Sequence, residues 1–425
     1  MHLRTAFELQ GAGCEAGRVH RPYHSRTIEK RRNLLIAGGA AAAIVCAGYD
    51  LWLWAGNYLS DNFHNDFTFY YAAALLGLQH GWPHLYDLKL QQAELDAIQS
   101  HITVAQLARY VSPPPLAWLV VPFTVLPYRA AYWLWSAVLV AALALAWYWA
   151  APGRGRVRLI LLVAAAGWLP VLYGLQLGQP ALLVAAAVAA CAALARRNRD
   201  VAAGAVLALI VVKPQLALLV APALLFAGRR RAFAAAAVVL ALAGAASALA
   251  LGPDGVSAYL ARLSFAQTVP ENQAQTLAAW IHDLAVTRVV QAAIALATLA
   301  LVYRLRRRGT DVAIAIALVG GLAASPYTHY DDLTMLGLGG WLLLREPRPG
   351  WTIGYVLALV IAGEGFPVWG AGPVIAGELA LLAGLALAPH AFLDPRQTAA
   401  PRPQPLPTAQ PAGPRDAQPA SRPRS

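Results

Sequence analysis

Three polar clusters interrupt an otherwise apolar chain, and each holds side chains able to move protons or bind anions. The first follows Asp61 and places Asp66 directly before an aromatic run. The second is Lys213-Pro-Gln, set within Ala-, Leu- and Val-rich sequence. The third runs from Ser325 to Asp332.

Asp66 fits two interpretations. Partial desolvation beside an apolar wall raises the basicity of a carboxylate, which suits a general base that takes a proton from a hydroxyl. Aspartate is also a common cap, and Asp66 precedes a helix predicted to begin at Phe67. The local sequence leaves both roles open.

Lys213 is one of three lysines, with Lys30 and Lys89, in a chain that otherwise uses arginine. A lysine in apolar sequence is costly unless it pairs or faces water. Its choice over arginine favours a point charge for a phosphate. A lysine that snorkels from a helix end is the alternative.

His329 lies close to Asp331 and Asp332 and could bind a metal, orient a phosphate or relay a proton. No third ligand with a recognisable spacing accompanies them, so we predict neither a metal site nor a cofactor. The alternative is a polar turn in which one of the two aspartates caps the next helix.

Composition assigns the chain to the membrane. Apolar residues make up 59% and charged residues 13% of its 425 residues, against roughly 25% charged in soluble domains. The net charge of +12 comes from short arginine clusters between apolar blocks, which is typical of cytoplasmic loops and not of a nucleic-acid-binding module. The shortage of lysine indicates a bacterium with a GC-rich genome, and hence its plasma membrane.

We expect an all-α polytopic membrane protein in three parts: a basic cytoplasmic segment 1–33, a membrane domain 34–398 and a disordered Pro- and Arg-rich tail 399–425. The predicted spans are 34–54, 130–150, 157–174, 180–195, 200–212, 215–227, 232–251, 286–303, 311–325, 331–344, 351–363 and 370–388.

The arginine clusters fix the sidedness of these spans. An even number of spans separates every successive pair of clusters only if residues 113–127, which are rich in proline, do not cross. With both termini in the cytoplasm, the first outer loop is 55–129, and residues 88–110 form an amphipathic interfacial helix within it. More than half of the acidic residues then lie on the outer face, together with Asp66, Lys213 and His329.

The order of these motifs resembles glycosyltransferase family 87, the polyprenol-phosphate-mannose-dependent alpha-mannosyltransferases. The resemblance covers roughly residues 34–345. The matching motifs are Asp66-Phe-x-x-Tyr-Tyr, Gly81, Leu85-Tyr-Asp87, Tyr110-x-x-Pro-Pro, Leu126-Pro127, Trp135, Gly178-Gln179, Ala203-Gly204, Lys213-Pro214, Asn272-Gln273, Ser325-Pro326 and His329-Tyr330. The chain departs from the family at Ala274-Gln275-Thr276, where a serine is usual soon after the Asn-Gln pair.

The resemblance implies a GT-C fold with about twelve spanning helices and the catalytic acid in the first outer loop. Asp66 would be the general base of an inverting hexosyltransferase. Its donor would be a polyprenyl-phosphate sugar and its acceptor a lipid or cell-envelope glycan. Lys213 and His329 would help to bind the donor phosphate or the acceptor. We also expect substrate binding by Tyr70, Gln179, Asn272, Gln273 and Tyr330.

Two other classes compete with this prediction. A transporter or lipid flippase would carry paired, interrupted short helices and internal repeats; the hairpin around Lys213 fits loosely, but no repeat is visible in the sequence. A non-catalytic assembly subunit is the third possibility. The large first outer loop with its acidic start favours the enzyme.

Overall fold

The computed structural model describes residues 23–60, 63–105, 107–345 and 350–388, and within these ranges its regular elements are all helical. Residues 1–22 of the predicted cytoplasmic segment and the whole predicted tail 399–425 lie outside the described residues. The α-helices are α1 (Tyr23–Ser60), α2 (Phe67–His80), α3 (Leu88–Ala97), α4 (Pro114–Val120), α5 (Tyr128–Ala150), α6 (Arg156–Ala166), α7 (Leu169–Leu177), α8 (Ala181–Arg196), α9 (Asp200–Leu207), α10 (Val220–Phe226), α11 (Arg230–Ala266), α12 (Pro270–Gln273), α13 (Leu284–Arg304), α14 (Thr310–Ala323), α15 (Thr334–Arg345), α16 (Trp351–Glu364), α17 (Phe366–Trp369) and α18 (Gly372–Ala386).

Three of the described helices, α5, α11 and α13, are long and apolar enough to cross a membrane, and the pair α6 and α7, bent by 55°, gives a fourth if it counts as one span. The other apolar helices are shorter. Only 11% of the apolar stretch of α11 is buried within the protein, as expected for a helix whose surface faces lipid. The all-helical prediction is confirmed, whereas the count of twelve spans stays a prediction.

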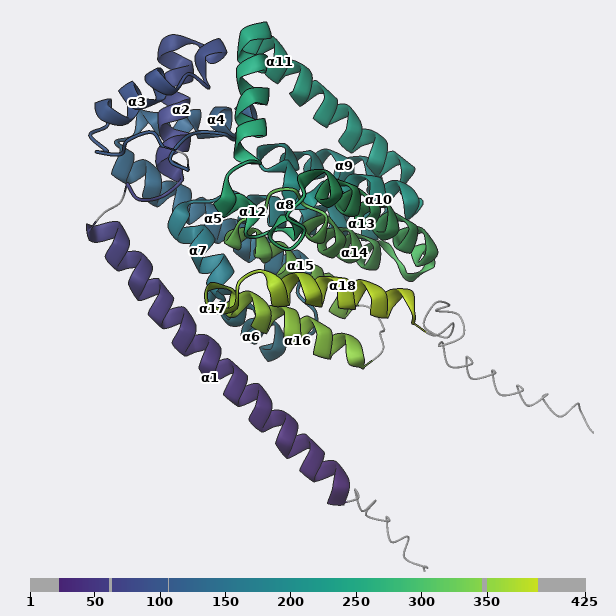
Figure 1. Cartoon of the computed structure of the whole chain (residues 1–425). Helices are drawn as coiled ribbons and strands as arrows, with labels where there is room; N and C mark the ends of the chain where they lie inside the picture. The colour runs from purple at the N-terminus through teal and green to yellow at the C-terminus, as the bar shows by residue number, and fades with distance from the viewer. Residues whose placement is uncertain (1–22, 61–62, 106, 346–349, 389–425) are drawn as a thin grey trace, which may run out of the picture.

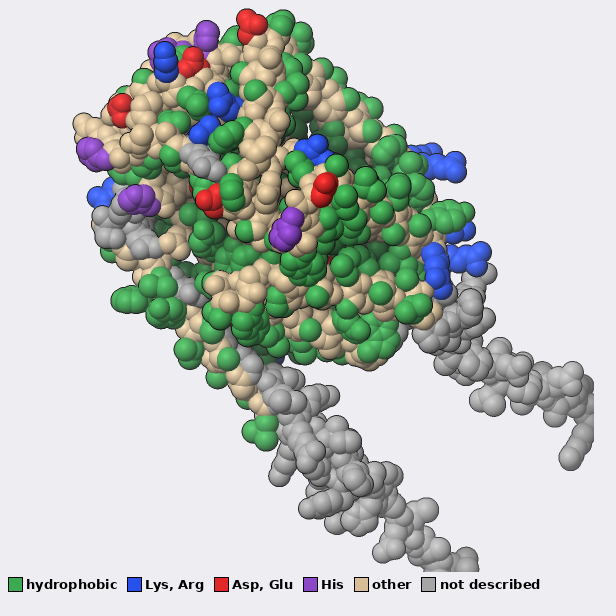
Figure 2. Space-filling model, viewed as in Figure 1, with side chains coloured by type: hydrophobic (Ala, Val, Ile, Leu, Met, Phe, Trp, Pro, Cys, Tyr) green, Lys and Arg blue, Asp and Glu red, His purple; other side chains and the backbone are tan. Residues whose placement is uncertain are grey.

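The helices form a bundle with a smaller module at one end (Figure 1). Helices α8 and α14 are buried along almost their whole length and form its centre. The module consists of α2, α3 and α4, and the upright limb of α11 stands beside it. Acidic and histidine side chains gather at this end together with some basic ones, and further basic side chains lie at the opposite end (Figure 2). The predicted sidedness of the loops stays a prediction.

Residues 113–127 form α4 and the short 3-10 helix η2 (Val121–Val125). Pro114 begins α4, and Pro122 and Pro127 lie in and after η2, so the backbone cannot continue as one helix. Twelve helical residues rise about 18 Å, well below the roughly 30 Å of the hydrocarbon core. The segment packs against α2 within the module, consistent with its exclusion from the predicted spans.

The predicted helix 88–110 is wrong beyond Ala97, where α3 ends. Two adjacent glutamines on α3 accept hydrogen bonds from backbone N–H groups of the segment that follows the helix. These bonds take the place of the backbone hydrogen bonds that a longer helix would form. Gln91 accepts from the Tyr110 N–H at 3.1 Å and donates to the Leu85 carbonyl at 3.0 Å. Gln92 accepts from the Val104 N–H at 2.7 Å. The segment after Ala97 is thereby held as an ordered loop that carries Tyr110 toward α2.

Helix α11 bends sharply at Gly252, where φ is 64°, and Pro253 follows. The distal limb of α11, residues 253–266, is helical where the sequence predicted an outer loop. It packs on the first loop: Gly255 lies so close to the backbone of Pro83 that a Cβ would meet its carbonyl oxygen at 2.9 Å. The ring of Tyr259 stacks on Tyr86 at 4.9 Å between centroids.

The turn between α7 and α8 depends on Gly178, whose φ of 70° is left-handed. A Cβ at this position would meet the Cβ of Phe67, at the start of α2, at 2.8 Å. The Trp135 indole donates to the Gly178 carbonyl at 2.7 Å, and the Asp66 N–H donates to the Leu177 carbonyl at 2.9 Å. The turn and the start of α2 are therefore fixed against each other.

We expect Gly178→Ala to destabilise the protein more than Gly228→Ala. Both glycines have positive φ (70° and 86°), but nothing lies within 4 Å of a Cβ at Gly228. The backbone conformation alone costs roughly 1–2 kcal/mol, and the contact with Phe67 adds about 1–3 kcal/mol. Thermal unfolding in detergent measures the difference. Equal losses of Tm in the two variants would show that α2 can move away from the added Cβ without a loss of stability.

Candidate active site

Asp66 ends the chain segment before α2, but its carboxylate does not cap that helix. The neighbouring Asn65 does so, because its Oδ1 accepts from the Thr68 N–H at 3.1 Å. The Asp66 carboxylate instead accepts a short hydrogen bond from the side-chain amide of Gln179. Asp66 remains partly accessible, so its carboxylate is both oriented and reachable.

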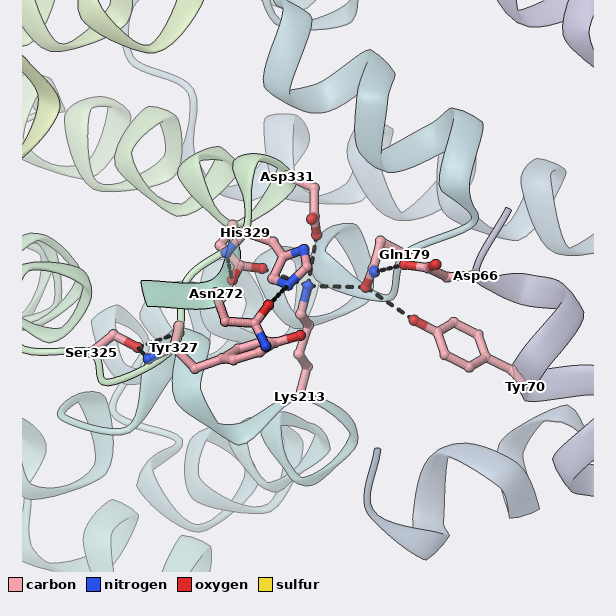
Figure 3. A network of polar contacts seen from close by, with 10 residues as sticks. Asp66, Tyr70, Gln179, Lys213, Asn272, Ser325, Tyr327, His329 and Asp331 are labelled. Carbon is pink, nitrogen blue, oxygen red and sulfur yellow. Dashed lines mark hydrogen bonds and ion pairs between the residues drawn. The ribbon is translucent and has the colours of Figure 1, made fainter. Parts of the chain in front are cut away.

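Gln179 is the link between Asp66 and the rest of the cluster (Figure 3). Its Oε1 accepts from the Tyr70 hydroxyl at 3.0 Å and from the Lys213 ammonium at 2.9 Å. Both hydrogen bonds to the oxygen fix the amide with its nitrogen toward Asp66. Gln179 is buried, with 6% of its surface exposed, and it follows directly on the constrained Gly178 turn.

Lys213 lies at the break between two apolar helical stretches, the 3-10 helices η3 (Ala208–Val212) and η4 (Pro214–Ala217). It is 7% exposed, and its ammonium pairs with Asp331 Oδ2 at 2.7 Å and Asp332 Oδ1 at 2.5 Å. With Gln179 this makes three oxygen partners, as many as the ammonium has protons. Lys213 is therefore a buried, fully paired cation and does not snorkel.

His329 joins the cluster from the other side. Its Nε2 lies 3.1 Å from Asn272 Oδ1, and Asn272 donates to the Ala266 carbonyl, at the end of α11, at 2.7 Å. The backbone N–H of His329 donates to Asp332 Oδ2 at 2.8 Å, and Tyr327 packs against its ring at 4.7 Å. Asp332 thus closes the turn that presents His329, while its other oxygen pairs with Lys213.

Burial dominates the electrostatics of the site. It raises the pKa of Asp66 above its usual value, although His329 and Lys213 act in the opposite direction. Burial also lowers the pKa of His329. A carboxylate of increased basicity beside a neutral imidazole is suited to accept a proton from a hydroxyl.

The structure brings together most of the residues that the sequence predicted. Two predicted substrate-binding residues have partners elsewhere: Gln273 donates to the Gln267 carbonyl at 2.9 Å, and the Tyr330 hydroxyl donates to the Gly363 carbonyl at 2.9 Å. Their roles stay predictions. The residues that meet at the cluster are Asp66, Tyr70, Gln179, Lys213, Asn272 and His329.

Sequence reasoning did not assign Asp331 and Asp332 as partners of Lys213. A signal was present, because a lysine in apolar sequence needs a counter-charge, and these two adjacent aspartates stand at the same predicted face. Within the described ranges, no group of three or more His, Cys, Asp or Glu side chains could hold a metal ion.

Comparison with known proteins found no match among curated proteins and none among solved structures. A family model does match: glycosyltransferase family 87, over residues 110–326. The matched region contains Gln179, Lys213 and Asn272, begins after Asp66 and ends shortly before His329. It spans slightly more than half of the chain, and the chain therefore belongs to glycosyltransferase family 87.

Proposed function

We propose that this membrane glycosyltransferase moves mannose or another hexose from a polyprenyl-phosphate donor to a lipid-linked or cell-envelope glycan acceptor. The reaction takes place on the extracytoplasmic face of a bacterial plasma membrane and inverts the anomeric carbon. The observation that carries the proposal is the Asp66 carboxylate. It is partly accessible, oriented by Gln179 and made more basic by burial.

In this reaction Asp66 takes the proton from the acceptor hydroxyl while the hydroxyl oxygen attacks the anomeric carbon. The bond between that carbon and the donor phosphate breaks, and polyprenyl phosphate leaves with the bonding electrons. Attack from the face opposite the leaving group inverts the configuration. A positioned general base contributes typically about 10²–10⁴-fold to such a rate.

The position of the cluster supports a lipid-borne donor. Lys213 lies between two apolar helical stretches, 200–212 and 214–226, so the cluster lies at the end of membrane-compatible segments. The module beside it carries the amphipathic helix α3, with Leu95 buried and Asp96 exposed. A substrate whose lipid tail stays in the bilayer would reach this level with its phosphate and sugar.

Lys213 and its partners position the reactive groups in this proposal. The ammonium already has three oxygen partners, and its removal would leave Asp331 and Asp332 buried without a counter-charge. Lys213 therefore holds Gln179, and through it Asp66, in place. His329 faces the same space and is the better candidate for contact with the donor or acceptor.

We expect Asp66→Asn to reduce sugar transfer by about 10²–10⁴-fold without loss of Tm. Asparagine carries no charge to desolvate, and the raised pKa of Asp66 means that its charged form opposes folding. The assay is transfer from a polyprenyl-phosphate hexose by purified protein. Asp87→Asn is the matched control, because Asp87 caps α3 in the same loop through the N–H groups of Lys89 and Leu90, and asparagine caps equally well.

Full transfer by a folded Asp66→Asn protein would contradict the assignment of the base. Donor flipping or uptake that survives this change, in a protein with no transfer activity, would instead favour the transporter.

The pH profile gives an independent test of the link between Gln179 and Asp66. The base must be ionised, so transfer falls as the pH drops through the raised pKa of Asp66, and the acid limb lies above the ordinary aspartate value. The hydrogen bond from Gln179 lowers that pKa, so Gln179→Leu should move the acid limb to higher pH. The measurement is kcat/KM between about pH 4 and 8, a range that begins near the ordinary aspartate pKa and extends upward from it.

Tyr70→Phe is the matched control for the pH profile. It removes one of the two hydrogen bonds to the Gln179 oxygen and leaves the amide nitrogen, which bonds Asp66, in place. We expect its acid limb to stay at the wild-type position, whatever its effect on rate. A Gln179→Leu profile that overlays the wild type would show that this amide does not tune the base.

A further inference from the structure

The acidic character of the cluster raises the question of what holds a donor phosphate. Two carboxylates, from Asp331 and Asp332, pair with the single ammonium of Lys213, and a third, from Asp66, joins them through Gln179. Burial lowers the pKa of His329, which disfavours its cationic form. An anion placed among these groups meets more negative than positive charge, so a phosphate needs cations that the cluster does not contain.

Two arginines next to the cluster are brought together without a carboxylate. The Arg109 guanidinium lies 4.6 Å above the ring of Phe265. Phe265 is on the distal limb of α11, three residues after Arg262, and residues so spaced share a helix face. Neither arginine forms an ion pair in the described part of the chain, and the Arg262 Nε is buried there without a hydrogen-bond partner.

The positions of both arginines are fixed by the elements that build the cluster. Arg109 precedes Tyr110, whose backbone is bonded by Gln91 and whose ring contacts that of Tyr70 at 6.3 Å. Arg262 lies one turn before Ala266, whose carbonyl accepts from Asn272, the partner of His329. The pair therefore borders the cluster through Tyr70 on one side and Asn272 on the other. Basic side chains are visible beside the distal limb of α11, which stands upright in this view, and they lie apart from the basic side chains at the opposite end of the bundle (Figure 2).

The local energetics favour an anion between these side chains. Burial and the neighbouring Arg262 both lower the pKa of Arg109, so two partly buried positive charges repel each other. The guanidinium fork matches the oxygens of a phosphate, and such charge-assisted hydrogen bonds are among the stronger ones in proteins. A bound phosphate would satisfy Arg262 and remove the repulsion.

We propose that Arg109 and Arg262 bind the phosphate group of a phosphorylated lipid. In the reaction proposed above, on which this assignment to the donor rests, that phosphate belongs to the polyprenyl-phosphate sugar. It would lie at the edge of the carboxylate cluster, with the sugar directed toward Asp66. In this arrangement the phosphate leaving group lies beside the two arginines, and the acceptor hydroxyl lies beside Asp66.

Binding can be measured without turnover in the Asp66→Asn background. The protein is placed in phosphatidylcholine nanodiscs and titrated with farnesyl phosphate, with farnesol as the ligand lacking phosphate. We expect Arg109→Gln and Arg262→Gln each to weaken farnesyl phosphate binding by about 10- to 100-fold and to leave farnesol binding unchanged. Arg288→Gln is the matched control: Arg288 lies nearby but is exposed and already donates to the Gln267 side chain at 2.7 Å.

A second arm identifies the source of the phosphate. In nanodiscs containing phosphatidylglycerol, unchanged affinity for farnesyl phosphate assigns the site to the prenyl donor. If phosphatidylglycerol instead competes with farnesyl phosphate, and Arg109→Gln and Arg262→Gln abolish this competition, the site binds a phospholipid headgroup. Should either variant fail to fold, a salt titration of the parent serves instead, because screening must weaken binding to a paired cationic site.

The inference is overturned if both folded arginine variants bind farnesyl phosphate like the parent, if Arg288→Gln weakens binding equally, or if farnesol binds as tightly as farnesyl phosphate. Failure of the proposed function is a separate result. A wild-type protein without transfer activity that still binds farnesyl phosphate through both arginines would refute the transferase and leave this site in place.

Discussion

The buried ion pairs of Lys213 are the constraint on which the site depends. An ammonium group removed from water costs several kcal/mol unless opposite charge compensates it, and here Asp331 and Asp332 supply that charge from a segment more than a hundred residues away. The need for compensation locks the hairpin that carries Lys213 to the loop that presents His329. The ammonium also donates to Gln179, whose amide bonds Asp66, and this connects the cluster to the start of α2.

This arrangement separates two electrostatic tasks. The proposed general base needs a carboxylate of raised pKa, which burial provides at Asp66 although His329 and Lys213 act in the opposite direction. A phosphate leaving group needs the opposite environment. In the proposed reaction, the buried lysine compensates Asp331 and Asp332, and the phosphate would bind to Arg109 and Arg262, which form no ion pair with the described residues.

The sequence predicted those features that depend on the hydration free energy of individual residues. Apolar length and arginine-rich loops predicted the helices and the common face of Asp66, Lys213 and His329, because hydration of charge and of apolar surface acts residue by residue. It was uninformative where side chains bond distant backbone. Gln91 and Gln92 end the predicted helix at Ala97 through contacts up to nineteen residues away, and nothing in a hydropathy pattern reports such bonds. The same holds for Asn65, which caps α2 in place of Asp66.

The bend of α11 explains how a site assembled from distant segments keeps one geometry. Past Gly252, the distal limb packs on Pro83 and Tyr86 of the first loop, carries Arg262 and Phe265 along one face, and ends at the carbonyl that anchors Asn272. Since Asn272 holds His329, one rigid limb sets the distance between the arginine pair and the imidazole. In the proposed donor, a polyprenyl-phosphate sugar, a single oxygen joins the phosphate to the anomeric carbon, so the groups that bind them must keep a fixed distance. The distal limb of α11 would set that distance, because it carries Arg262 and ends at the carbonyl that holds Asn272.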